Sequence, residues 1–327
     1  MLNQLKKNQY ILLAGATGYI GSYVLKRLKE LGYKVVCPVR KYPKNNVQDK
    51  SSFYIQAEIL DYDNLKKSVF SKYPISAVIS CIGSRNGNPK DSWDVDFEAN
   101  NQLLKLSLEV GVANFVLLSA ICVQKPKLEF QFAKLAFENQ LKASGLCYSI
   151  VRPTAFFKSL AGQIENILAG KSFVVFDDGK KTACKPISGD DLAKFICDCL
   201  DKEGQQNQIL PIGGPGPAIT QLEQGKMLFR ILKKKQKFKR VPSYIFKVLI
   251  VSIAPFAIFF KKAMNLKEFL KIGHYYATES MLVWDDEANS FFTEKTPETG
   301  AETLEQFYCQ ILKDGLEKHK LGEHKLF

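Results

Sequence analysis

Hydrophobic residues in the first half of the chain come in short, nearly continuous runs, separated by segments with a helical period. Such runs predict buried strands, because a strand that is covered on both faces shows no alternation. We place strands at residues 10–14, 33–40, 53–59, 76–83, 114–121 and 147–153, and helices at 22–32, 61–70, 97–111 and 129–145. Strands that alternate with helices of this length build a parallel sheet. The pattern predicts an α/β fold with a Rossmann-type, doubly wound parallel sheet.

The pattern loosens after residue 153. A helix at 187–201, a strand at 208–214, a helix at 222–233 and an amphipathic tail at 304–320 follow. We assign residues 8–155 to the first domain and residues 156–320 to a smaller, mixed C-terminal lobe for the substrate. Later segments of this lobe can return to the first domain.

The composition is typical of a globular protein and gives no sign of a metal-binding one. The chain has 327 residues, of which 46% are hydrophobic and 24% charged. Its eight cysteines form no C-x-x-C pair, and its three histidines have no zinc-ligand spacing. We therefore expect no metal site, and small buried thiols in a reducing compartment. The first ten residues run directly into a strand, so we expect no secretory signal.

The net charge of +13 is concentrated in one segment. Residues 226–271 hold thirteen Lys or Arg and one acid, Glu268, a balance of +12. Within it, YIFKVLIVSIAPFAIFF (244–260) carries a single charge, Lys247. The segment is short for a spanning helix. Two interpretations stay open: an anchor at an anionic membrane surface, or a buried helix pair with a solvated basic face. No nucleic-acid reader motif accompanies the basic residues, so we expect no nucleic-acid partner.

A glycine-rich loop follows the first strand. The residues from Gly15 to Gly21 read GATGYIG and open a helix. The first glycine permits a tight turn, Gly18 lets the backbone approach a pyrophosphate, and Gly21 allows close packing of helix and strand. The helix N-terminus then faces the phosphates. We predict a dinucleotide site whose loop also contains Thr17, Tyr19 and Ile20.

Further cofactor contacts are expected where the strands end. Arg40 ends the second strand, where an NAD-specific site usually has an acid, and an arginine there pairs with a 2′-phosphate. We therefore predict NADPH as the cofactor. The remaining candidates are Asp61 for the adenine amino group, Cys81, Ile82 and Gly83 after the fourth strand, Ser119 after the fifth, Pro153 after the sixth, and Lys134 for the ribose hydroxyls.

Residues 129–134, EFQFAK, lack an expected acid. Lys134 has the place of the lysine in the Tyr-x-x-x-Lys motif of short-chain dehydrogenases, but Phe130 replaces the tyrosine that protonates a carbonyl oxygen. Either the fold is a non-catalytic NADP sensor, or hydride goes to a carbon–carbon double bond that is conjugated with a larger system.

Longer blocks make the second explanation specific. They are SWDVDFEANNQLL (92–104), LLSAICVQKPKLEFQFAK (117–134), YSIVRPTAFFKSLAGQ (148–163), TACKPIS (182–188), LPIGGPGPAITQLEQGKMLFR (210–230) and YYATESMLVWD (275–285). These blocks resemble the NADPH-dependent divinyl chlorophyllide a 8-vinyl-reductases, an atypical short-chain dehydrogenase family, from about residue 10 to 315. The resemblance implies reduction of the C8 vinyl group of a magnesium chlorin to ethyl in chlorophyll or bacteriochlorophyll synthesis. It also implies the cytoplasm of a photosynthetic bacterium, or the plastid stroma or a membrane surface.

The resemblance suggests roles for further residues. Our hypothesis is that hydride goes to the terminal vinyl carbon, the ring stores the negative charge, and an acid or an ordered water supplies a proton. Lys134, Tyr275 and Tyr276 are the catalytic candidates; Phe156, Phe157, Lys158, Lys185 and Lys125 are candidates for contact with the pigment. Core packing is the alternative for the aromatic residues, and His274 is more simply structural than a magnesium ligand.

Two competing functions fit the missing tyrosine. One is a catalytically idle NADP-binding regulator of the NmrA-like kind. The other is an isoflavone-reductase-like enzyme that acts on another conjugated substrate. The regulator does not explain the long reductase-like blocks, and the absorbance change of a divinyl substrate on reduction separates the alternatives.

Overall fold

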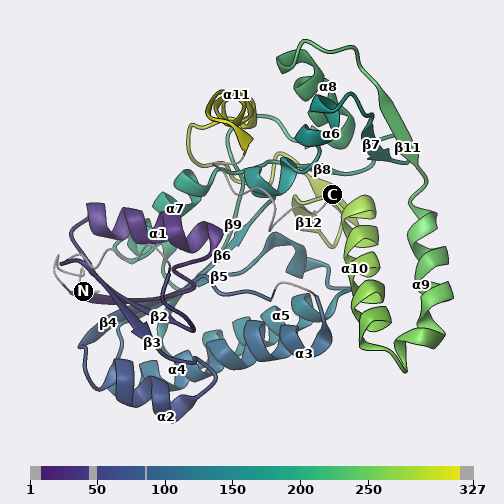
Figure 1. Ribbon diagram of the computed structural model, residues 1–327. Coiled ribbons are helices and arrows are strands. Elements are labelled where there is room, and N and C mark those ends of the chain that lie inside the picture. The colour runs from purple at the N-terminus through teal and green to yellow at the C-terminus, as the bar shows by residue number, and fades with distance from the viewer. Residues whose placement is uncertain (1–8, 44–49, 85–86, 317–327) are drawn as a thin grey trace. The chain divides into compact units, whose positions relative to one another are not determined.

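The central sheet of the protein has seven strands in the order β3-β2-β1-β4-β5-β6-β9 (Figure 1). The computed structural model describes residues 9–43, 50–84 and 87–316. The strands are β1 (Tyr10–Ala14), β2 (Lys34–Val39), β3 (Ser52–Gln56), β4 (Ile75–Ser80), β5 (Asn114–Leu118), β6 (Cys147–Pro153) and β9 (Gln208–Ile212). Strands β1 to β6 pair in parallel, and β1 lies between β2 and β4. The predicted doubly wound parallel sheet is confirmed.

Helices cover both faces of this sheet (Figure 1). They are α1 (Tyr19–Glu30), α2 (Tyr62–Leu65), α3 (Pro89–Ser92), α4 (Ala99–Val110), α5 (Glu129–Ala143) and α7 (Gly189–Asp198). Leu12, Val78 and Phe115 are fully buried beneath α4 and α5, where the rings of Phe115 and Phe137 lie 5.8 Å apart. Burial on both faces explains why these strands read as continuous apolar runs.

The chain divides into two compact units, and the first is not continuous in sequence. It runs to Arg152 and also includes Leu192–Leu210, whereas the second comprises Pro153–Asp191 and the chain from Pro211 onward. Several hydrogen bonds tie the returning segment to the first unit. Among them, Asn114 donates from Nδ2 to the Cys199 carbonyl (3.1 Å), and the Ser149 hydroxyl donates to the Gln205 carbonyl (2.8 Å). The predicted lobe at 156–320 therefore contains a stretch that belongs with the first unit.

The second unit combines short strand pairs with helices. Its strands are β7 (Phe173–Phe176) with β11 (Phe238–Val241), β8 (Ala183–Cys184) with β10 (Ile219–Thr220), and β12 (Val283–Asp285) with β13 (Ser290–Phe292). Its helices are α6 (Ile164–Leu168), α8 (Gln221–Ile231), α9 (Tyr244–Ala257), α10 (Lys261–Thr278) and α11 (Leu304–Asp314). The core includes Tyr308, whose hydroxyl donates to the Leu160 carbonyl at 2.9 Å. Burial raises the pKa of this phenol.

The cysteines are free thiols, and seven of the eight are buried or half-buried. Burial raises the pKa of Cys81 to about 12 and that of Cys184 to about 12, so both stay neutral thiols at physiological pH. Cys309 on α11 is exposed, which differs from the expected burial. Among the described residues no three His, Cys, Asp or Glu side chains gather as metal ligands.

Candidate active site

The glycine loop between β1 and α1 has the geometry that the sequence predicts. Gly15 has a φ of +86°, a conformation that residues with a Cβ rarely adopt. Gly21 lies so close to the turn that a Cβ on it would stand 2.0 Å from the Gly15 carbonyl oxygen. Gly15 is packed in turn against the Cys81 carbonyl group after β4. The loop therefore packs closely between the end of β1 and the end of β4.

The N-terminus of α1 is suited to hold phosphate groups. Gly18 is the N-cap residue, no side chain caps the helix, and the first turn contains no acid. The unsatisfied N–H groups and the helix dipole therefore point at the loop without a competing negative charge. The strand order also reverses between β1 and β4, where ligands of doubly wound sheets bind. These residues fit the diphosphate of a dinucleotide.

Replacing Gly21 by alanine should damage this site more than the same change elsewhere. The new methyl group would collide with the Gly15 carbonyl, which belongs to backbone and has little room to move. We expect a loss of about 1–3 kcal/mol in the free energy of unfolding and at least a tenfold weaker NADPH affinity. Gly204→Ala is the matched control, because a Cβ there meets nothing within 4 Å. Equal affinities for the two variants in a fluorescence titration would contradict the assigned role.

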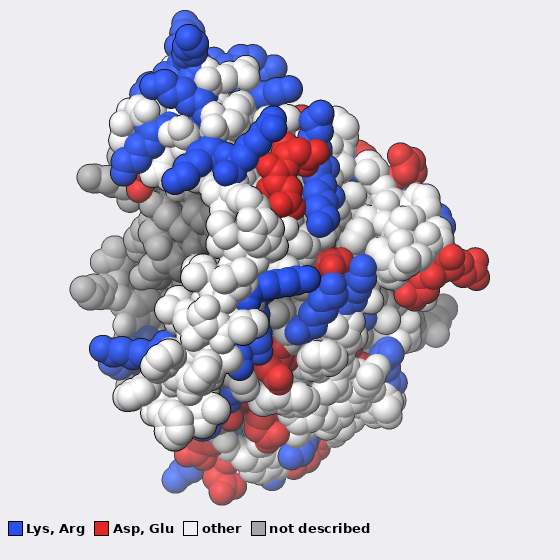
Figure 2. All heavy atoms as spheres, turned by 90° about the vertical axis from the view of Figure 1, so that its right-hand side faces the viewer, with Lys and Arg blue, Asp and Glu red and all other residues white. Residues whose placement is uncertain are grey.

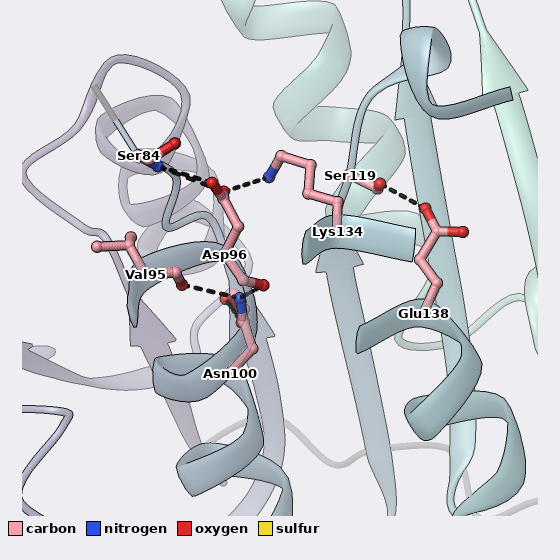
Figure 3. Close-up of polar contacts among 8 residues, drawn as sticks. Ser84, Val95, Asp96, Asn100, Ser119, Lys134 and Glu138 are labelled. Atoms are coloured by element: carbon pink, nitrogen blue, oxygen red, sulfur yellow. Dashed lines mark hydrogen bonds and ion pairs between the residues drawn. The ribbon is translucent and has the colours of Figure 1, made fainter. Parts of the chain in front are cut away.

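Lys134 meets a buried carboxylate that sequence reasoning did not identify. Its Nζ lies 2.9 Å from Oδ1 of Asp96, whose side chain is fully buried (Figure 3). The Ser84 backbone N–H donates to the same carboxylate at 3.3 Å. A Cβ on Gly83 would lie 3.6 Å from the Asp96 oxygen and 3.8 Å from the Lys134 nitrogen. The ion pair therefore lies directly beside the chain that leaves β4.

Asp96 is held in place by its own secondary structure. It lies in a π-helical turn, Trp93–Glu98, that leads into α4. Asn100 donates from Nδ2 to the Asp96 carbonyl at 3.0 Å (Figure 3). Its Oδ1 accepts from the Ser80 hydroxyl at the end of β4. Wide turns of this kind are frequent at functional sites. Asp96 lies in the block at 92–104, but the sequence does not distinguish it from the neighbouring acids Asp94 and Glu98.

A second buried charge pair lies one helical turn after Lys134. Glu138 is fully buried, accepts a hydrogen bond from the Ser119 hydroxyl, and is bridged by Arg152 through Nε at 3.1 Å and through Nη2. The Ser119 hydroxyl proton is thus directed at Glu138 (Figure 3). Lys134 and Glu138 are four residues apart on α5, so both project from one side of the helix. Sequence reasoning identified Ser119 and Lys134 but neither Glu138 nor Arg152.

The other cofactor candidates of the first unit lie near the ends of their strands. Arg40 is exposed directly after β2. Asp61 caps α2, because its Oδ1 accepts from the Asn64 N–H at 3.0 Å, so part of this carboxylate is already engaged. Pro153 is the last residue of β6. Thr17 is exposed, whereas Ile20 is 4% exposed and packs in the core. Lys125, a pigment candidate, is half-buried after the short helix Ile121–Gln124.

The pigment candidates of the second unit are mostly occupied by protein contacts. Phe157 is fully buried, and its ring lies 5.2 Å from that of Phe307, which favours the core-packing alternative. Lys185 forms an ion pair with Glu298 and donates to the Thr296 carbonyl at 3.3 Å. The pKa of the Glu298 carboxyl is lowered by the Lys185 ammonium and by the Gly216 N–H. Lys158 is buried and Phe156 half-buried.

The tyrosine candidates lie together on α10. Tyr275 is 2% exposed and Tyr276 is half-buried, and their rings meet edge to face at 5.6 Å. His274 precedes them and sets its ring edge to face against Phe246 at 6.4 Å. The proton-donor role of the two tyrosines stays a prediction.

Comparison with known proteins agrees with a nucleotide-binding fold. A family model described as NAD(P)H-binding matches residues 15–203, from the glycine loop to the returning segment. Among solved structures, a UDP-glucose 4-epimerase from Thermotoga maritima has a TM-score of 0.63 at 21% identity and covers 71% of this chain and 86% of its own. A nucleoside-diphosphate-sugar epimerase from Staphylococcus aureus has a TM-score of 0.66 at 13% identity, over 92% and 100%. These structures support the fold.

Curated sequences are much more similar. The chloroplastic divinyl chlorophyllide a 8-vinyl-reductase of Arabidopsis thaliana is 45% identical over 98% of this chain and 81% of its own length. That of Cucumis sativus is 46% identical over 98% and 80%. The matched length includes the region outside the NAD(P)H-binding match. The chain belongs to the divinyl chlorophyllide a 8-vinyl-reductase family and contains an NAD(P)H-binding domain.

Proposed function

We propose that the protein reduces the C8 vinyl group of divinyl chlorophyllide a, or of a related divinyl chlorin, to ethyl with NADPH. The observation that carries the proposal is the 44–46% identity to four reductases of that name along 97–98% of the chain. The glycine loop, the bare α1 N-terminus and Lys134 support the cofactor half of the reaction. A regulator without catalysis would not require such identity outside the nucleotide-binding unit.

The chemistry suits a site without a phenol at position 130. NADPH, when bound, supplies the hydride. The vinyl group is conjugated with the chlorin ring, which can delocalise the negative charge before a proton arrives, so no acid has to stand beside a nascent alkoxide. Lys134 would bind the ribose hydroxyls and place a positive charge near the reacting atoms, while Asp96 fixes the direction of its ammonium group.

As part of the proposal, the reaction takes place in the plastid of a eukaryote or in the cytoplasm of a photosynthetic bacterium, at the surface of a membrane. The plant relatives are named as chloroplastic, which supports the plastid for a eukaryotic host. Among the described helices none is long and apolar enough to cross a bilayer. An apolar pigment with a carboxylate suits a site at such a surface.

An absorbance scan tests the reaction directly. Purified protein is mixed with divinyl chlorophyllide a and NADPH, and a parallel sample receives NADH. We expect a blue shift of the Soret band with NADPH and little change with NADH. An unchanged spectrum from protein that binds NADPH in a separate titration would overturn the proposed reaction.

Arg40 should decide between the two nicotinamide cofactors. We expect Arg40→Ala to lower kcat/KM for NADPH about 10- to 100-fold, because a charge-assisted bond to the 2′-phosphate is lost, and to leave the value for NADH unchanged. Lys72→Ala, an exposed lysine of the same unit, is the control. A parallel loss with both cofactors would mean that Arg40 does not read the 2′-phosphate.

A further inference from the structure

Helix α9 exposes apolar side chains where a soluble helix would bury them. None of its fourteen residues is buried. Val251 is 71% exposed, and the turn that follows continues the surface with Phe259 at 80%. The exposed apolar residues of this region are Tyr244, Ile245, Val248, Leu249, Val251, Phe256, Ile258, Phe259, Phe260, Leu266 and Phe269. A contiguous surface of this kind marks an interaction site.

One side of α9 is covered by α10, and the rest has no cover in the described structure. The half-buried residues Phe246, Ile250 and Ile253 recur at helical spacing and form the covered side. Phe246 fits against Gly273, where a Cβ would lie 2.7 Å from its ring. We call α9, the turn 258–260 and α10 the α9–α10 hairpin; its two helices run side by side in Figure 1.

Exposed cations border the apolar surface. Figure 2 shows this side of the molecule, where Lys and Arg gather above a strip of uncharged atoms. Exposed cations in this region include Lys233, Lys235, Lys237, Lys239, Arg240, Lys247, Lys261 and Lys262. The ion pairs between described residues involve none of them. These charges are therefore available to an anionic partner.

We propose that the α9–α10 hairpin lies in the interface of an anionic lipid membrane, with α9 and the turn 258–260 in the headgroup and upper acyl region. The inference deepens the membrane-surface part of the proposed function and rests on it. Apolar side chains bordered by lysines and arginines are what interfacial helices use. At about 1.5 Å per residue, a helix of this length lies in the interface instead of crossing it.

A second copy of the chain is a poorer occupant of the same surface. Two copies that joined through α9 would bring their basic borders into proximity, and like charges at an interface cost free energy. A lipid surface with phosphate headgroups satisfies both the apolar strip and the cations. An anionic bilayer can thus bind the apolar strip and the cations at the same time.

Vesicle flotation of the full chain tests the proposal without pigment or catalysis. Vesicles of phosphatidylcholine with a minor share of phosphatidylglycerol are compared with pure phosphatidylcholine. We expect binding to the anionic vesicles at about 0.01 M salt, where charges act over about 30 Å, and weaker binding at 1 M salt.

Val251→Glu with Phe259→Glu should reduce the bound fraction at least tenfold, because two carboxylates then replace apolar side chains at the lipid surface. Both side chains are highly exposed, so the substitutions leave the core intact.

The matched control is Leu108→Glu, an equally apolar exposed site on α4 in the first unit, which should bind like the unchanged protein. NADPH affinity and circular dichroism of all variants verify the fold. Absence of flotation at low salt would overturn the proposal. So would a concentration-dependent dimer in sedimentation velocity that the double substitution abolishes. Vinyl reduction is assayed separately, with detergent-solubilised pigment. The membrane proposal can therefore fail while the proposed reaction holds, and the reaction can fail while membrane binding holds.

Discussion

Replacing Lys134 by methionine should lower kcat/KM for the pigment about 100- to 1,000-fold, the usual loss when a charge-stabilising donor is removed. The substitution also strands the buried Asp96 carboxylate, at a cost of about 3–5 kcal/mol of stability. A fall in activity could then reflect unfolding. The double variant Lys134→Met with Asp96→Asn removes both charges together, so it should fold better than the single variant and still lack activity.

Asp96→Asn alone separates positioning from charge. An amide can accept from Lys134 and from the Ser84 N–H as the carboxylate does, but without the ionic attraction that fixes the ammonium. We expect a smaller loss in kcat/KM, at most about 100-fold, with part of it in the KM for NADPH. Asp96→Glu should move the ammonium and recover little.

Steady-state kinetics with NADPH varied at saturating pigment measure both effects, and a pH profile of kcat adds a readout that a merely structural role would leave unchanged. Lys142→Met is the matched control, because this lysine is exposed on the same helix. Near-normal activity of the folded double variant would refute a catalytic part for the pair.

Replacing Glu138 by leucine should destabilise the first unit about as strongly as the loss of Lys134. It leaves the Arg152 guanidinium partly buried without its carboxylate, and deprives the Ser119 hydroxyl of its acceptor. Breaking a buried pair in this way costs about 3–5 kcal/mol. We expect a lower midpoint of thermal and urea unfolding and weaker NADPH protection.

The cause can be isolated with a second substitution. Arg152→Met combined with Glu138→Leu replaces both charges by apolar side chains of similar size, and should recover most of the lost stability. Glu30→Ala breaks only exposed ion pairs with Lys26 and Arg27, so it should change the free energy of unfolding by less than about 0.5 kcal/mol. If the double variant is no more stable than Glu138→Leu, the loss comes from packing.

The sheet and the phosphate-binding loop could be predicted from the sequence, because both depend on local sequence patterns. A strand buried on both faces is apolar throughout, and a tight turn with a φ of +86° favours glycine. The strand pattern and Gly15 could therefore be predicted from the sequence. Lys134 was found through its spacing. Asp96 and Glu138 were not, because their importance comes from neighbours distant in sequence, Ser84 and Arg152 among them.

For the basic apolar segment, in contrast, the sequence could not decide between burial and exposure. A helix that is apolar all round normally belongs in a core, so the sequence left a buried helix pair and a surface anchor open. The exposure of Val251 and Phe259 depends on which side of α9 packs against α10, and the contact of Phe246 with Gly273 belongs to that side. No local signal gives this contact. Phe157 is a similar case. The sequence made it a candidate for pigment contact beside Lys158, but its side chain packs in the core of the second unit.

The return of residues 192–210 to the first unit constrains the order of events on the ribosome. Strand β6 ends at Pro153, yet its neighbour β9 begins at Gln208, so about fifty residues must be synthesised before the sheet is complete. During that interval β6 presents an unpaired edge, the kind of template from which misassembly starts. A fragment that stops at Arg152 would keep this edge permanently. We expect such fragments to aggregate, and chaperones that shield strand edges to act on the nascent chain before residue 212 emerges.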